Sequence, residues 1–138
     1  MGNSRYIDRI VIHCSATTPD TDIGADEIRM WHQDRGWQDI GYHYVIRRDG
    51  TLEVGRPEHV VGAHARGYNE HSIGVCLVGG VTESAVSDAN FTLKQYLKLL
   101  TLCTHLMRKY KDAQVVGHRD LPGVAKDCPC FDVAEFFK

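Results

Sequence analysis

The chain has 138 residues, enough for one domain but too few for a catalytic domain with a separate binding module. Hydrophobic residues make up 43% of the sequence and charged residues 25%, a composition that excludes disordered and collagen-like chains. With 16 Lys and Arg against 18 Asp and Glu, the formal net charge of −2 supplies no field that would attract nucleic acid or an anionic membrane. We therefore expect a single domain over residues 1–138.

The sequence shows no segment for export or membrane insertion. The N-terminal residues, MGNSRYIDR, lack the apolar region of a signal peptide, so we expect synthesis in the cytoplasm without a leader. The longest apolar runs, such as residues 73–78, are far shorter than the roughly 20 residues of a membrane span.

The chain begins with a predicted strand and a predicted helix. The β-branched residues within 7–12 indicate a core strand that ends near His13. Apolar residues repeat with helical spacing over about 25–35, and Gly36 is expected to end this helix in a left-handed conformation.

Three further strands are predicted between residues 42 and 78. Asp49 and Gly50 lie between the alternating segments 42–47 and 51–54, which indicates a β-hairpin. Segment 73–78 is apolar at odd and even positions, as in a strand covered on both faces. We therefore expect it at the centre of a sheet.

The C-terminal part of the chain is predicted to be mostly helical. A wide apolar face indicates a helix over about 92–110. A short strand at 114–117, a loop at 118–130 and a terminal helix at 132–138 follow. Strands that alternate with helices predict the α/β class, with helices on the faces of one sheet.

Histidine and cysteine side chains near the predicted strand ends are the candidates for chemistry. His13 and His118 each follow an apolar strand, and ligand sites gather at strand ends in open α/β sheets. Cys128 lies in the following loop, which could fold over the same edge. Two imidazoles and a thiolate make three ligands of a catalytic zinc site, and this donor set favours zinc over magnesium or calcium. The spacing alone selects no metal, so structural roles for these residues are the alternative.

The cysteine count does not indicate a disulfide framework. The number of cysteines, 5, is odd. Cys14, Cys76 and Cys103 lie in apolar runs, where a free cysteine behaves as a small buried hydrophobic residue.

Six short blocks occur in a fixed order over about residues 7–133. They are VIHCSAT (11–17), GYHY (41–44), GAHARGYN (62–69), SIGVC (72–76), GHRD (117–120) and KDCP (126–129). In this order they resemble the zinc-dependent N-acetylmuramoyl-L-alanine amidases of the amidase-type phage lysozymes, relatives of the peptidoglycan recognition proteins. The resemblance implies a single mixed central β-sheet flanked by helices. It also implies hydrolysis of the amide bond between N-acetylmuramic acid and the stem-peptide L-alanine of peptidoglycan.

The resemblance also assigns site residues. It places the family's Zn²⁺ ligands at His13, His118 and Cys128, its active-site tyrosine at Tyr42 and its active-site lysine at Lys126. Zinc would make water acidic and polarise the amide carbonyl, and an ammonium beside it would stabilise the developing oxyanion. Since no residue corresponds to the glutamate of HExxH enzymes, we expect Tyr42 to serve as the general base.

One block is expected to line the substrate groove. The resemblance places His64, Arg66 and Asn69 there, where imidazole and amide groups suit peptide carbonyls; a polar surface loop is the alternative. His43 directly follows Tyr42, so strand alternation predicts that its ring faces the opposite side of the sheet and packs there or supports a ligand.

Cys130 departs from the family pattern. The phage relatives tend to have a small polar residue after Cys-Pro, whereas this chain has a second thiol. In an extended segment Cys128 and Cys130 would face the same side, so Cys130 is an alternative ligand. The alignment of blocks favours Cys128.

Two non-catalytic functions are the alternatives to catalysis. Several peptidoglycan recognition proteins lack the metal-ligand cysteine and bind without cutting, but this chain retains all three ligands. A phage lysozyme of the family also inhibits its phage's RNA polymerase, and the short stretch before His13 disfavours that role here. We expect a monomer that acts on peptidoglycan or released muropeptides, in phage or prophage lysis after release to the cell wall, or in wall turnover.

Overall fold

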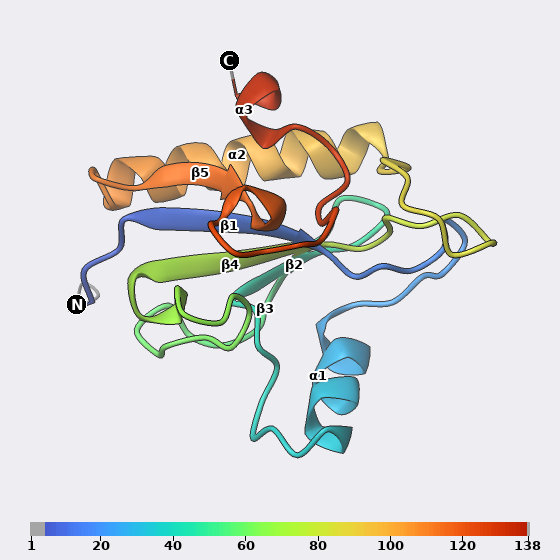
Figure 1. Ribbon diagram of the computed structural model, residues 1–138, viewed down its shortest axis with the longest axis horizontal. Coiled ribbons are helices and arrows are strands. Elements are labelled where there is room, and N and C mark those ends of the chain that lie inside the picture. Colours follow the sequence, from blue (N-terminus) through green and yellow to red (C-terminus); the bar gives the residue numbers. More distant parts are fainter. Residues whose placement is uncertain (1–4, 138) are drawn as a thin grey trace.

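The computed structural model describes residues 5–137 and shows one sheet with helices on both faces (Figure 1). The strands are β1 Arg9–Cys14, β2 Tyr44–Ile46, β3 Leu52–Val54, β4 Ser72–Leu77 and β5 Gln114–Gly117. The α-helices are α1 Ala25–Asp34, α2 Leu93–Lys109 and α3 Val133–Phe136, and the 3₁₀ turns are η1 Asn69–His71 and η2 His118–Asp120.

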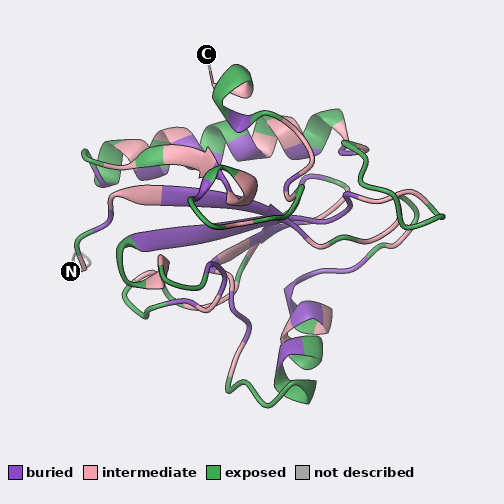
Figure 2. Cartoon of the chain, in the orientation of Figure 1, coloured by how far each residue is buried: buried purple, intermediate pink, exposed green. Residues whose placement is uncertain are grey.

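The sheet is mixed, as predicted. Its order is β3-β2-β4-β1-β5. The hairpin strands β2 and β3 are antiparallel, whereas β2, β4, β1 and β5 run parallel. β4 is the central strand and is buried along its whole length, as the purple arrow in Figure 2 shows. The α/β class and the central position of this segment are therefore confirmed.

The two faces of the sheet have separate cores. Ile10 and Ile12 of β1 and Ile73 of β4 pack on the side of α2 and α3, together with Leu99 and Leu106 of α2. Burying each such side chain contributes roughly 1.5–3 kcal/mol. The opposite face packs against α1, and its core comprises Ile23, Ala25, Ile28, Ile40, Val45, Cys76 and Val78.

The helix ends follow the local sequence. The Thr92 hydroxyl accepts a hydrogen bond from the Gln95 backbone N–H, and the Gln95 side chain accepts one from the Thr92 backbone N–H. This reciprocal cap satisfies two amides that the first turn of α2 leaves unpaired. After α1, Gly36 has a φ of 92°, the left-handed conformation expected there.

Element boundaries differ from the predicted ones by a few residues. β2 begins at Tyr44 rather than at residue 42, and α3 ends at Phe136. The predicted terminal helix extended to Lys138, which lies outside the described residues. Within residues 5–137, no helix has both the length and the apolar character needed to cross a membrane.

The topology places the ends of β1 and β5 side by side. The two strands are adjacent and parallel, and Ile12 pairs with Gly117. His13 follows Ile12 within β1, and His118 follows Gly117 directly. Both imidazoles therefore come to the same edge of the sheet, as expected for parallel neighbours.

Candidate metal centre

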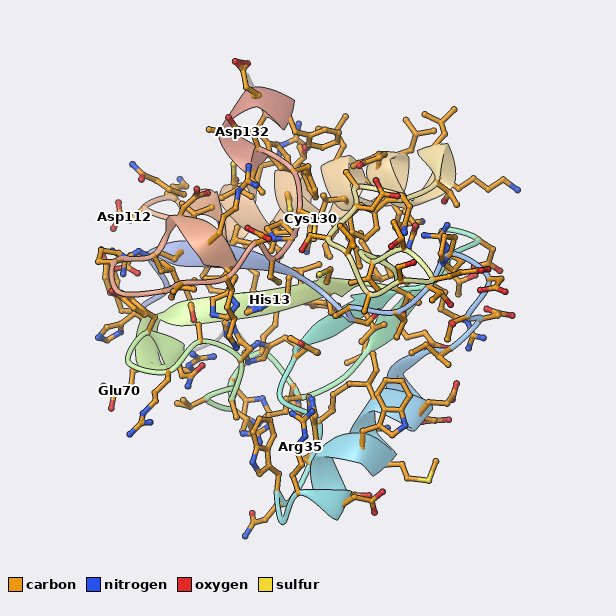
Figure 3. The ribbon with its side chains drawn as sticks, turned by 45° about the vertical axis from the view of Figure 1, so that its right-hand side comes forward. His13, Arg35, Glu70, Asp112, Cys130 and Asp132 are labelled. Atoms are coloured by element: carbon orange, nitrogen blue, oxygen red, sulfur yellow. The ribbon has the colours of Figure 1, made fainter. Side chains whose placement is uncertain are left out.

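His13, His118 and Cys128 come together at this edge. One ligand atom of each residue lies within 4.8 Å of the others, and the His13 and His118 ring centroids are 4.5 Å apart. His13 is buried, whereas His118 and Cys128 are partly exposed. Figure 3 shows His13 near the middle of the molecule. The convergence expected from the sequence is present in the structure.

Three contacts hold the Cys128 loop over the sheet edge. The Arg119 backbone N–H donates to the Cys128 carbonyl over 2.8 Å, and the Cys14 backbone N–H donates to Cys128 Sγ over 3.1 Å. Gly117 lets Pro129 approach, since a Cβ there would lie 2.9 Å from Pro129 Cδ. The thiol that is distant in sequence is thus anchored to β1 and to η2.

The surroundings keep both histidines neutral. Burial, reinforced by His64, His118 and Lys126, holds the pKa of His13 well below its usual value. Burial and the Lys126 charge also lower the pKa of His118. A metal binds neutral imidazole, so these shifts favour the form that coordinates. Two imidazole nitrogens and one sulfur fit Zn²⁺.

Tyr42 and Lys126 lie close to the two histidines. The Tyr42 ring centroid is 5.1 Å from that of His13. Burial, and then the neighbouring cysteines, raise the pKa of Tyr42 well above its usual value, so the phenol stays protonated at neutral pH. The Lys126 side chain is exposed, but its charge acts on both His13 and His118.

A cavity of about 730 Å³ opens beside these residues. Its lining includes His64, Arg66, Asn69, His118 and Lys126. The residues predicted from the sequence to contact substrate thus border the cavity that contains the candidate catalytic lysine.

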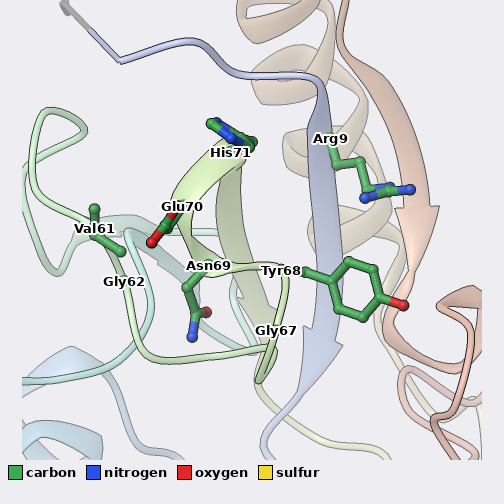
Figure 4. A pocket seen from close by; sticks show the side chains of 8 residues that line it. All are labelled: Arg9, Val61, Gly62, Gly67, Tyr68, Asn69, Glu70 and His71. Carbon is green, nitrogen blue, oxygen red and sulfur yellow. The ribbon is translucent and has the colours of Figure 1, made fainter.

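A second cavity, of about 400 Å³, shares Tyr68 and Asn69 with the first. In Figure 4 the Tyr68 side chain extends from the loop that also bears Asn69, and its ring lies on the side of Arg9. The Arg9 guanidinium lies 5.1 Å from the Tyr68 ring centroid. The two cavities therefore border one another at Tyr68.

Arg66, Asn69 and His64, which were predicted to line the substrate groove, differ in exposure and in hydrogen bonding. Arg66 is exposed. The Asn69 side-chain oxygen accepts the backbone N–H groups of His64 and Ala65, so it shapes the loop as well as lining the cavity. His64 is only 9% exposed, and its Nδ1 lies 2.8 Å from His13 Nε2. Sequence reasoning missed this contact, because nothing in the spacing links residues 13 and 64.

The predicted orientation of His43 is wrong, although its packing role is confirmed. Alternation does not apply, because β2 begins only at Tyr44. The His43 ring lies 5.8 Å from the His64 ring, within the same aromatic group as Tyr42 and His13. His43 is fully buried; Gly74 N–H donates to its Nδ1, and its Nε2 contacts the Val60 carbonyl.

Cys130 is directed away from the ligand group. Its φ of 76° breaks the extended conformation that would have placed it on the same side as Cys128. Its Sγ lies 3.2 Å from the Gly80 carbonyl and 3.9 Å from Cys14 Sγ. As predicted, Cys14, Cys76 and Cys103 are buried free thiols.

The chain is similar in sequence and in fold to a phage endolysin, to an amidase and to a recognition protein. The endolysin of Escherichia phage T7 is 48% identical over 131 residues, which cover 95% of this chain and 85% of the endolysin. The amidase LysC from Clostridium intestinale matches with a TM-score of 0.81 at 33% identity, over 96% of this chain and 83% of LysC. The recognition protein PGRP-LB of Drosophila matches with a TM-score of 0.71 at 26% identity, over 94% of this chain and 78% of PGRP-LB.

The family match covers nearly the whole chain. The family described as N-acetylmuramoyl-L-alanine amidase matches residues 3–131, a span that includes the three candidate ligands together with Tyr42 and Lys126. The chain belongs to the N-acetylmuramoyl-L-alanine amidase family.

Proposed function

We propose that this chain cleaves the amide bond between N-acetylmuramic acid and the L-alanine of the peptidoglycan stem peptide, with a zinc ion held by His13, His118 and Cys128. The observation that carries the proposal is the meeting of these three donors within 4.8 Å, beside a cavity. The T7 relative is an endolysin, so we further propose that the activity serves phage lysis of the cell wall.

The donor set determines the chemistry that the site can perform. Zinc bound by three protein ligands acts as a Lewis acid toward a carbonyl and makes water acidic enough to supply hydroxide near neutral pH. His13, His118 and Cys128 would hold the ion, and the lowered pKa values of the two histidines keep each imidazole neutral, with one ring nitrogen unprotonated.

Lys126 is suited to stabilise charge on the substrate. Attack of water on the lactyl carbonyl carbon places negative charge on the carbonyl oxygen. The Lys126 ammonium borders the cavity beside His118, so it can pair with this oxygen. A single donor that acts on such an oxyanion is worth roughly 3–4 kcal/mol in other enzymes.

Tyr42 is suited to position the attacking water. Its ring lies beside His13, and its raised pKa keeps the hydroxyl protonated. A protonated phenol donates a hydrogen bond but accepts no proton, so the orienting role is favoured over the general-base role. The proton that water loses must finally reach the amine of the departing L-alanine.

A turbidity assay separates catalysis from binding alone. Purified cell walls should lose turbidity when the zinc-loaded protein is added, and a chelator should stop the loss. A protein that sediments with the walls without clearing them, at one equivalent of zinc, would instead be a binding module. The three ligands that this chain retains favour the first result.

A further inference from the structure

Both ring nitrogens of His64 are engaged inside the protein. Its Nδ1 lies 2.8 Å from His13 Nε2, and its Nε2 lies 3.1 Å from Ser72 Oγ. Ser72, the first residue of β4, is fully buried, and its hydroxyl donates to the Tyr68 carbonyl over 2.8 Å. A continuous chain of hydrogen bonds thus runs from His13 through His64 and Ser72 to a backbone carbonyl.

The neighbouring glycines make room for this arrangement. Ser72 and Gly74 are alternate residues of β4, so they face the same side of the sheet. A Cβ at Gly74 would lie 2.5 Å from His64 Cγ, and a Cβ at Gly62 would lie 2.8 Å from His64 Cδ2. Only glycine at these two positions leaves the space that the imidazole occupies.

The direction of each hydrogen bond in this chain follows from its last acceptor, the Tyr68 carbonyl. The Tyr68 carbonyl can only accept, so the Ser72 proton is committed to it. Ser72 Oγ must then accept from His64 Nε2–H, and the Nδ1 of a neutral His64 carries a lone pair. That lone pair accepts from His13 Nε2–H. The remaining nitrogen of His13, Nδ1, has no proton.

We propose that His64 and Ser72 are positioning residues that fix the tautomer of His13 and leave its Nδ1 lone pair free for the metal. The inference rests on the zinc site of the proposed function and adds how one of its ligands is prepared. The other His13 tautomer would place an unprotonated His64 Nε2 against Ser72 Oγ, whose proton is already donated. One buried hydrogen bond would be lost, which disfavours that tautomer.

This arrangement changes the role expected for His64. A residue that binds substrate needs a free donor or acceptor in the cavity, whereas both ring nitrogens of His64 are hydrogen-bonded to His13 and Ser72. Histidine ligands of metals usually donate their second ring N–H to a neighbouring acceptor, which orients the ring and fixes its tautomer. Here the acceptor for His13 is the His64 imidazole, and the hydrogen bond to Ser72 fixes the tautomer of His64.

The tautomers can be measured in the metal-free protein by long-range proton–nitrogen correlation spectra. In the wild type we expect His13 and His64 each to be protonated at Nε2 only. His43 is an internal control, because the Gly74 N–H and the Val60 carbonyl fix its Nε2–H tautomer independently of Ser72. A wild-type His13 protonated at Nδ1 would overturn the proposal.

The variant Ser72→Ala tests the origin of the preference. We expect mixed tautomers at His64 and His13, an unchanged tautomer at His43, and a zinc dissociation constant raised about 10-fold or more, in the range seen when partners of metal ligands are removed. A folded Ser72→Ala protein with the wild-type His13 tautomer and zinc affinity would contradict the positioning role. A zinc-binding wild type that cleaves no peptidoglycan would contradict the proposed function and leave the tautomer result standing.

Discussion

The backbone N–H of Cys14 donates a hydrogen bond to Cys128 Sγ over 3.1 Å. This bond joins the end of β1 to a loop more than 100 positions later in the chain, so it sets the sulfur beside the His13 imidazole. Cys14 therefore helps the ligand group through its backbone, while its side chain lies in the core.

The first prediction separates the two cysteines of the C-terminal loop. Cys128→Ser should abolish stoichiometric zinc binding, because a serine hydroxyl is a poor zinc ligand. Cys130→Ser, the matched control, should keep one zinc per chain, since Cys130 Sγ is directed to the Gly80 carbonyl. Elemental analysis of both purified variants decides. Zinc that is retained in Cys128→Ser and lost in Cys130→Ser would show that the ligand was misassigned.

The second prediction concerns Lys126. Lys126→Ala should lower turnover about 100- to 1,000-fold, the usual effect of removing one oxyanion donor. Zinc content should not change, because the grouped donors are His13, His118 and Cys128, and a lysine ammonium has no lone pair to offer a metal. The exposed Lys111 offers a control, and Lys111→Ala should retain full activity. Equal turnover in both variants would exclude a role for the Lys126 ammonium.

The third prediction concerns the Tyr42 hydroxyl. Tyr42→Phe keeps the ring beside His13 but removes the hydrogen bond that orients water, so turnover should fall about 100-fold with zinc retained. Tyr96→Phe removes a hydroxyl from a tyrosine of the α2 core and should leave turnover unchanged. Steady-state rates on purified cell walls compare the two variants. Wild-type rates for Tyr42→Phe would remove Tyr42 from the mechanism.

The fourth prediction is a pH dependence of stability. Burial lowers the pKa of His43 from 6.5 to about 4. Between these values the unfolded chain binds a proton that the folded chain does not, so stability should fall as the pH falls from 6.5 to 4, by about 3 kcal/mol from this residue. Urea unfolding of the metal-free protein at several pH values measures the slope.

A pair of substitutions isolates that contribution. His43→Gln should flatten the pH dependence, although it also lowers stability at pH 7. The exposed His105 serves as the control, and His105→Gln should keep the wild-type slope. An unchanged slope in His43→Gln would mean that His43 titrates alike in the folded and unfolded chains.

The elements were predictable where the local pattern determines the structure. The apolar run of β4 required cover on both faces, and the spacing of the apolar residues in α2 required one buried stripe. Both elements lie where they were expected. Boundaries were less predictable: the alternating sequence pattern indicates a strand from residue 42, whereas β2 starts at Tyr44.

The meeting of the three candidate ligands was predictable, but the contacts that hold them in place were not. Strand ends indicated His13 and His118, and the family blocks added Cys128, Tyr42 and Lys126. The contact between His13 and His64 depends on the empty space above Gly74, which only the tertiary structure shows. The Cys130 side chain likewise turns away from the ligand group because its backbone is left-handed, a conformation that the residue type does not predict.

The central claim is that zinc held at His13, His118 and Cys128 supports cleavage of the amide that joins the glycan to its peptide. The most direct measurement is mass spectrometry of peptidoglycan digested by protein of known metal content. We predict one zinc per chain, and stem peptides released with a free N-terminal L-alanine and no attached muramic acid. Fragments cleaved within the glycan or within the peptide, or full release of L-alanine peptides by a zinc-free His13→Ala protein, would contradict the claim.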